Sequence, residues 1–296
     1  MEGKGSFIVV TVIFLGLSLL TASCGRIVAK ESAAEIKDLE KNIVKVDDMK
    51  VLPENEGKLV VVGGMAKRDS IVLDDEFDMS KETILLYRKV EMYQWREVVD
   101  GDDYKYTKDW YERLIDDSTF EHKNGFLKES HENPNKKPYE SKNFFNEVIL
   151  GDFKLTNEQI SKIKPTIVIE ELSSEVADEF DMIIEDHYYT TVKEGNPKIG
   201  DVRISFFIVD PSKYKNITIL AKQIGNTFEE FRVDNGTPAG RMTNDIFDGV
   251  LSPAEVIASR ENEGDSYSMF FYILAIILLI PIALAARNTF KKKNSY

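Results

Sequence analysis

Two long uncharged stretches dominate the pattern of apolar and polar positions along the chain. The first fills the 21 positions between Lys4 and Arg26, and the second fills the 21 positions between Asp265 and Arg287. A helix rises about 1.5 Å per residue, so each stretch spans roughly 30 Å, the thickness of the hydrocarbon core of a bilayer. Soluble helices seldom stay uncharged over that length. The pattern therefore predicts two transmembrane helices, at residues 7–24 and 267–286.

Between these helices the pattern becomes that of a mostly β domain. Short runs rich in β-branched and aromatic residues alternate with Gly, Asp and Pro, which is typical of strands separated by turns. The predicted strands include residues 59–62, 83–95, 104–110, 166–172, 201–209 and 217–224, with a turn at Gly63-Gly64. Helices are predicted at residues 27–50, after a Thr156 cap, and after a Ser252 cap followed by Pro253. The predicted fold is an α+β membrane protein: one long, mostly β unit with a few helices, flanked by two transmembrane helices.

Charge predicts the orientation of the chain. The tail after the second apolar stretch holds four basic residues and no acid, which is typical of a cytoplasmic flank. With two spans, residues 1–6 and the basic tail at 287–296 are both expected in the cytosol, and residues 25–266 form an extracytoplasmic or lumenal domain. Residues 26 to 265 contain 33 of the 38 basic and 50 of the 51 acidic residues, a net charge of -17. Such an acidic surface argues against nucleic acid as a partner.

The single cysteine leaves an alternative for the first apolar stretch. Residues 20–24 (LTASC) resemble the cleavage box of a bacterial lipoprotein, in which Cys24 would be acylated. We favour an uncleaved anchor, because the leucine usual three positions before the cysteine is a threonine here. One cysteine also excludes an intrachain disulfide and a zinc site built from several cysteines.

The residues that could carry chemistry do not form a convincing motif. His122 and His131, beside Glu121 and Glu132, could ligate a metal, but their spacing differs from HExxH and favours a solvated loop. His187 is expected at the surface or packed in a strand. Solvation is also the favoured role for the acidic clusters, which lack the spacing of a calcium loop: Asp47-Asp48, Asp74-Asp75-Glu76, Asp102-Asp103 and Asp116-Asp117. The tryptophans Trp95 and Trp110 are predicted core residues. No catalytic, cofactor-binding or metal-binding residue is therefore predicted.

An ordered set of segments resembles one known family. The first apolar stretch is followed by GRIVAK (25–30), and further on come VEMYQWREV (90–98), YKYTKDW (104–110), HENPNKKPYES (131–141), NPKIGDVRISF (196–206), ITILAKQIG (217–225) and GVLSPAEVI (249–257). In this order they resemble the LUMA family, also called the transmembrane protein 43 family. The resemblance implies an N-terminal anchor, a large lumenal domain and several C-terminal spans. It also implies self-association, organisation of membrane complexes in the endoplasmic reticulum and inner nuclear membrane, and no enzymatic activity.

This sequence departs from the family pattern at its C-terminal end. It stops ten residues after the second apolar stretch, where the family continues through more helices. Functions housed in those helices are therefore not carried over. We expect a non-enzymatic membrane scaffold that contacts the bilayer and binds itself or membrane-protein partners. The membrane is a bacterial cell membrane, or the endoplasmic reticulum or inner nuclear membrane in a eukaryote. Two alternatives stay open: an extracytoplasmic hydrolase or metal-dependent enzyme, and a lipoprotein-like envelope component acylated at Cys24.

Overall fold

The chain forms two compact units. The computed structural model describes residues 2–68, 71–101, 103–121 and 131–293. The first unit comprises Met1–Gly63 with Thr218–Tyr296, and the second comprises Gly64–Ile217. The sequence predicted one long unit between the helices. The division arises because strand β2 (Leu59–Met65) pairs with the distant strand β15 (Asn216–Ile224), which leaves the intervening chain to build a core of its own. A local sequence pattern cannot predict a pairing between strands so far apart in the chain.

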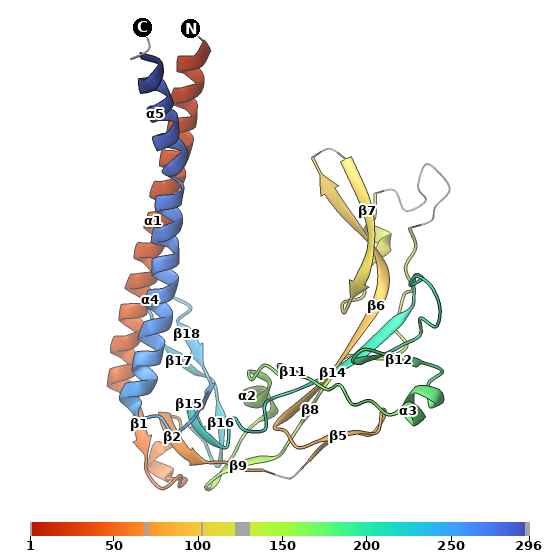
Figure 1. The fold of residues 1–296 in the computed structure, drawn as a ribbon. Helices are drawn as coiled ribbons and strands as arrows, with labels where there is room; N and C mark the ends of the chain where they lie inside the picture. The colour runs from red at the N-terminus through yellow and green to blue at the C-terminus, as the bar shows by residue number, and fades with distance from the viewer. Residues whose placement is uncertain (1, 69–70, 102, 122–130, 294–296) are drawn as a thin grey trace. The chain divides into compact units, whose positions relative to one another are not determined.

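Two apolar helices lie side by side in the first unit. Helix α1 (Glu2–Asn42) packs antiparallel against α4 (Pro253–Ile277), and α5 (Ile280–Lys293) continues in line with α4 (Figure 1). Both stretches, Thr11–Asn42 and Pro253–Leu284, are long and apolar enough to cross a membrane, and their apolar windows are 11% buried inside the structure. Their exposed apolar side chains suit hydrocarbon as solvent. The predicted pair of transmembrane helices is thus confirmed, and the charged helix predicted at 27–50 is the continuation of α1 as far as Asn42.

The second apolar stretch contains one break, between α4 and α5. Pro281 has no N–H to donate to the carbonyl of Ile277, four residues earlier. The chain tightens there, and the N–H of Leu279 donates to the carbonyl oxygen of Ile276 at 3.0 Å. The helix resumes when Ala283 N donates to Leu279 O at 3.1 Å. Membrane helices tolerate such a break because neighbouring turns satisfy the freed backbone groups.

A small sheet covers the helices' base in the first unit. Its strand order is β1 (Val44–Val46), β2, β15 and β16 (Thr227–Glu229), with β19 (Asp245–Asp248) also paired to β15. A hairpin of β17 (Phe231–Val233) and β18 (Arg241–Thr243) and the 3-10 turn η1 (Pro53–Asn55) complete the unit. The sheet and the helices enclose one apolar core, formed by Leu39, Leu59, Val61, Leu220, Val233 and Val256.

The predicted turn at Gly63-Gly64 is wrong, because both glycines lie within β2. A Cβ atom on Gly63 would lie 3.1 Å from Thr218 Oγ1 and 3.2 Å from Val250 Cγ1. The glycine therefore serves close packing and not a change of chain direction.

Both predicted helix caps are confirmed. Ser252 accepts a hydrogen bond from Glu255 N, while the Glu255 carboxylate accepts one from Ser252 N at 2.7 Å, so α4 begins with a capping box. Thr156 and Gln159 form the same arrangement at the start of α2 (Asn157–Ser161). These contacts are local in sequence, which is why the sequence alone could predict them.

The second unit is built on a seven-stranded sheet. Its main order is β12 (Ile183–Glu185), β13 (Tyr188–Thr190), β14 (Val202–Ile208), β6 (Leu85–Asp100) and β7 (Asp103–Tyr111). Strand β11 (Ile167–Val168) also pairs with β14, and β8 (Lys142–Phe145) also pairs with β6. The smaller elements are β3 (Lys67–Arg68), β9 (Val148–Leu150) and β10 (Phe153–Lys154) in one sheet, the hairpin of β4 (Val72–Asp74) and β5 (Met79–Lys81), the 3-10 turn η2 (Asp117–Thr119) and helix α3 (Ser174–Glu179).

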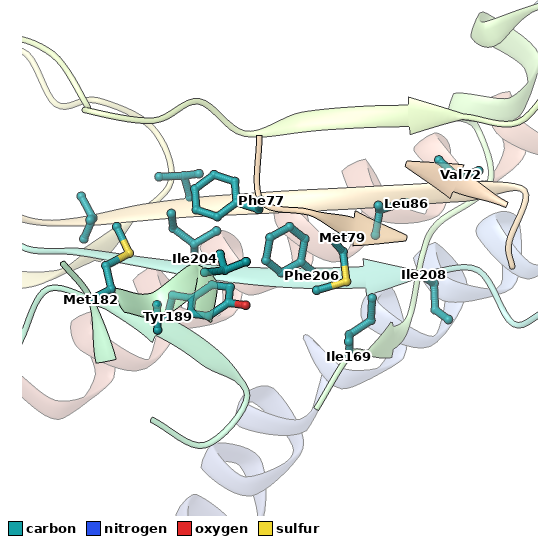
Figure 2. Close-up of a cluster of buried hydrophobic side chains, with 14 of the residues drawn as sticks. Val72, Phe77, Met79, Leu86, Ile169, Met182, Tyr189, Ile204, Phe206 and Ile208 are labelled. Atoms are coloured by element: carbon teal, nitrogen blue, oxygen red, sulfur yellow. The ribbon is translucent and has the colours of Figure 1, made fainter. Parts of the chain in front are cut away.

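An aromatic and aliphatic core lies against one face of this sheet. Figure 2 shows Phe77 and Phe206 at its centre, with Tyr189 and Met182 beside them. The rings of Phe77 and Phe206 meet edge to face, with centroids 5.9 Å apart. Phe77 also stacks on Phe180 at 4.6 Å. These side chains come from β4–β5, β13, β14 and the α3 region, so the core fixes the long strand β6 in place.

Candidate functional site

The β6–β7 hairpin is the most prominent feature of the second unit. Strand β14 pairs with β6 over residues 86–92, and β8 pairs with it over 85–88. Beyond these ranges, from Gln94 to Asp100, β7 is the one strand that pairs with β6 among the described residues. The two strands therefore leave the sheet as a two-stranded ribbon (Figure 1). Such a ribbon is only marginally stable by itself, so its side chains must hold it in place.

An aromatic cluster supports the base of the ribbon. His131 stacks on Tyr106, with ring centroids 3.9 Å apart and planes 10° apart, and meets the edge of Trp95 at 4.6 Å. Lys108 Nζ lies 4.0 Å from the centroid of the Trp95 ring. His131 is only 9% exposed. His131 lies outside the helices and strands, as predicted, but its predicted exposure to solvent is wrong, because the imidazole packs against the rings of Tyr106 and Trp95.

Asn133 holds the segment after His131 against the ribbon. Its side chain accepts a hydrogen bond from Trp95 N at 2.7 Å and donates one to Trp95 O at 3.0 Å. Its own backbone N–H donates to Asp117 Oδ2 at 2.7 Å. The amide thus completes the backbone hydrogen bonding of Trp95 as a neighbouring strand would. Sequence reasoning missed this residue, because an Asn-Pro pair is typical of a turn.

The tip of the ribbon exposes apolar side chains. Val99 is 65% exposed, and Val98 and Tyr104 are each 38% exposed. Val99 lies directly opposite Tyr104 in the ladder, and an ion pair between Lys105 and Asp100 flanks them. Cross-strand neighbours on one face reach each other, so Val99 and Tyr104 form a small apolar surface at the tip. The only sequence signal for it is a pair of valines that precedes an Asp-Gly turn.

An open pocket lies beside the base of the ribbon. Its volume is about 630 Å³, and it is broadly open to solvent. Both charged and apolar side chains line it, among them Arg96, Glu97, Tyr111, Arg113 and Phe120. Glu97 is held there by hydrogen bonds from Tyr106 Oη at 2.6 Å and from Glu121 N at 2.8 Å. The Glu97 carboxylate thus links β6 to Tyr106 of β7 and to the backbone of Glu121, which helps to hold the ribbon in place.

One acidic cluster has a role that the sequence did not predict. Asp74 was expected to be solvated, yet it is 1% exposed and paired with Arg88, which is 2% exposed. Glu76 lies 2.6 Å from the second guanidinium nitrogen of Arg88. The prediction fails because nothing in the local pattern shows that β4 places Asp74 next to a buried arginine of β6. Buried charges persist only when paired in this way.

A second ion pair joins β6 to β14 nearer the surface. Arg203 Nε donates to Glu91 Oε2 at 2.8 Å, and Lys89 Nζ lies 2.8 Å from Glu91 Oε1. Burial acts to raise the pKa of Glu91, but hydrogen bonds from Arg203 and Lys89 outweigh it, so the pKa lies below its ordinary value. The guanidinium of Arg203 also lies 4.8 Å from the centroid of the Trp110 ring. The core position predicted for Trp110 is therefore wrong, because this ring is half-buried beneath Arg203, whereas Trp95 is buried as predicted.

The remaining sequence candidates are dispersed. His187 contacts Tyr188 edge to face, Asp47 pairs with exposed Lys45, and Asp116 caps η2. Cys24 is exposed on α1. His122 and Asp102 lie outside the described residues. Within the described residues, no group of three or more His, Cys, Asp or Glu side chains could hold a metal ion.

Comparison with known proteins identifies one family. A family model described as Transmembrane protein 43 matches residues 92–290, more than half of the chain. Human transmembrane protein 43 is 26% identical over 258 residues, which cover 78% of this chain and 62% of the human protein. The mouse protein is 24% identical over 284 residues (88% and 68%), and the Drosophila melanogaster homolog is 26% identical over 219 residues (68% and 54%).

These relatives are longer than the stretch they share with this chain. The chain spans about 62% of the length of the human protein. No solved structure matches the chain. The family match covers the ribbon, the strands β14 and β15 and the second apolar helix. The chain is therefore an integral membrane protein with two apolar helices, and it belongs to the transmembrane protein 43 family, also called the LUMA family.

Proposed function

We propose that the chain is a non-enzymatic membrane scaffold, which binds a second copy of itself or a membrane-protein partner through the domain between its helices. The observation that carries this proposal is the β6–β7 ribbon with its exposed Val99 and Tyr104. Burying Val99 and Tyr104 against another protein would remove apolar surface from water. The ribbon is braced from behind by His131 and Asn133, so it would present this surface without first having to order itself.

The orientation of the domain is part of the proposal. The four basic residues after residue 286 favour the cytosol for the tail, and with two spans the ribbon would then lie outside the cytosol or in a lumen. The partner would then be a protein with a domain in that compartment. The acidic surface of the domain, with its net charge of -17 over residues 26 to 265, favours a partner with a basic face.

A photo-crosslinking amino acid at position 99 of the full chain, in native membranes, tests the proposal. We expect a discrete adduct, at twice the mass of the chain for self-association or at the summed mass of chain and partner. A Val99→Asp substitution should abolish the complex, as followed by a crosslinker placed at Lys105, and leave the thermal unfolding temperature unchanged. The matched control is Ile71→Asp, which changes another exposed apolar residue of the same unit (56% exposed). The absence of any discrete adduct at position 99, or equal loss in both variants, would contradict the proposed scaffold surface.

A further inference from the structure

A pocket lies where α1 and α4 leave the apolar segment. The helices are in close contact there: a Cβ atom on Gly264 would lie 2.0 Å from Ser32 Oγ, so only glycine fits. Immediately beside this contact is a pocket of about 410 Å³, whose wall includes Ser32, Gly264, Val28 and Tyr267. Every residue that lines the pocket belongs to the first unit.

An ion-pair network forms the polar end of this pocket. Arg241 Nη1 donates to Glu35 Oε2 at 3.2 Å, and Arg241 Nη2 donates to Glu263 Oε2 at 3.0 Å. Arg260 Nη1 also reaches Glu263 Oε2, at 3.4 Å, and Arg260 pairs with Asp245. Three carboxylates thus share two guanidinium groups. The network keeps an excess negative charge.

One oxygen of this network has no partner. Glu35 Oε1 is buried and accepts no hydrogen bond, and the Glu35 side chain is only 7% exposed. Leaving a buried charged oxygen without a donor is costly, and such a group calls for an explanation. Glu35 belongs to the wall of the pocket. A donor that enters the pocket would supply the missing hydrogen bond.

The surroundings select a cation that carries N–H donors. Glu31, one helical turn before Glu35 on the same face of α1, also lines the pocket and adds a second carboxylate. Arg241 is already engaged by two carboxylates, so it does not make the pocket an anion site. An ammonium group with its own protons fits both carboxylates, whereas a quaternary ammonium has no proton to donate to Glu35.

The position of the pocket identifies the source of that ammonium. The uncharged stretch of the second span begins after Asp265, and Gly264, which contacts Ser32, lies one residue before Asp265. At about 1.5 Å per residue, Glu35 lies about 4.5 Å beyond Ser32 along α1. The head-group layer is about 5–8 Å thick on each side of the hydrocarbon core, so the lower part of the pocket lies within it. Tyr267 is 59% exposed at the pocket's rim, where aromatic side chains favour the interface.

We propose that this pocket binds the head group of an ethanolamine phospholipid, with its ammonium group hydrogen-bonded to Glu35 and Glu31. Soluble amines carry the same ammonium group, but they have no acyl chains to contact the apolar rim at Tyr267 and Met242. The lipid would join the two membrane helices to the hairpin of β17 and β18, which contributes Met242 and Arg241 to the pocket. This role does not depend on the partner-binding ribbon.

Native mass spectrometry of the full chain in detergent tests the proposal. The protein is titrated with an equimolar mixture of dioleoyl phosphatidylethanolamine and dioleoyl phosphatidylcholine, and retention of each lipid is measured. We expect a preference for the ethanolamine lipid of about tenfold, because one hydrogen bond to a charged group contributes on that order. Glu35→Gln and Glu31→Gln should each bring the ratio close to one.

Glu40→Gln is the matched control, since Glu40 is an exposed acid on the same helix. The control should keep the preference. Glu31→Gln leaves the pair of Glu35 with Arg241 intact, so it remains informative if Glu35→Gln fails to fold. Equal retention of the two lipids by the unaltered protein, or a preference that survives both pocket substitutions, would overturn the proposal. Displacement of the lipid by free phosphoethanolamine at equal concentration would overturn the lipid as the source.

Discussion

Arg88 and Asp74 form a closed ion pair inside the second unit, with Arg88 Nη1 lying 3.0 Å from Asp74 Oδ1 and 2.9 Å from Oδ2. Arg88 Nε donates to the carbonyl oxygen of Glu140 at 3.1 Å, and its guanidinium lies 4.9 Å from the centroid of the Phe77 ring. The arginine therefore joins β6, β4 and the chain before β8 around the aromatic core. If one partner of so deeply buried a pair is removed, the other is left as an uncompensated charge in the protein interior.

Removal of one partner should destabilise the domain strongly. In Asp74→Ala, Arg88 keeps its charge in an apolar surrounding without its main counter-ion, and we expect a loss of about 3–5 kcal/mol in the free energy of unfolding. Thermal unfolding of the full chain in detergent measures the effect. Asp75→Ala changes the adjacent, exposed acid and should shift stability by no more than about 0.5 kcal/mol. Similar effects of the two substitutions would show that the ion pair is not a structural element.

Glu91 makes the stability of the second unit depend on pH. Its pKa in the folded chain lies below its ordinary value, because the hydrogen bonds from Arg203 and Lys89 outweigh the effect of burial. An acid with a lowered folded pKa stabilises the fold above its unfolded pKa, about 4.3, and this stabilisation is lost as the pH falls through the folded value. The unfolding temperature should therefore drop as the pH falls below the unfolded pKa and through the lower folded pKa of Glu91.

Glu91→Gln should flatten this part of the pH profile. Glu82→Gln, at an exposed acid just before β6, should leave the profile as it is. An unchanged slope in Glu91→Gln would assign the acid sensitivity to other carboxylates.

Local patterns predicted the parts of the fold that depend on local interactions. The capping boxes at Thr156 and Ser252 each rest on residues within one turn of each other. The apolar stretches were equally clear, because a span of bilayer requires an uninterrupted run. The strands of the domain were largely recognisable from their β-branched and aromatic residues.

Non-local contacts account for what the sequence did not predict. The division into two units depends on the pairing of β2 with β15, and the burial of Asp74 depends on an arginine that another strand provides. The burial of His131 was not predicted because its ring partners, Tyr106 and Trp95, lie on a hairpin formed earlier in the chain. Gly63 resembled a turn residue for the same reason: its packing partners, Thr218 and Val250, come from the far end of the sequence.

The proposed orientation can be tested by cysteine labelling. In a Cys24→Ser background, cysteine is introduced at Asn135, between the helices, or at Ser295, in the basic tail. An impermeant thiol reagent applied outside intact cells, or inside sealed vesicles, should reach position 135 and spare position 295, because the positive flank is retained in the cytosol. Permeabilisation, the control, should make position 295 reactive. Labelling of position 295 alone, or of both positions, before permeabilisation would contradict this orientation.

The seam between α1 and α4 depends on small residues, and one glycine provides the sharpest test. A Cβ atom on Gly25 would lie 3.2 Å from the carbonyl oxygen of Ser268 and 3.3 Å from Phe271 Cβ. On the same seam, Ser18 Oγ donates to the carbonyl oxygen of Ala275 at 2.8 Å. Close approach through small residues drives association of membrane helices, since lipid leaves no hydrophobic driving force between them.

Gly25→Leu should therefore separate the two helices, whereas Gly16→Leu should not, because a Cβ atom on Gly16 meets nothing within 4 Å. The separation is measured with cysteines at Ser18 and Ala275 in the Cys24→Ser background. Oxidation should join them efficiently in the parent and in Gly16→Leu. It should join them poorly in Gly25→Leu, because the leucine side chain must displace Phe271 or the backbone of Ser268. Equal crosslinking in the two leucine variants would mean that the helices are held together by the domain above them and not by the seam itself.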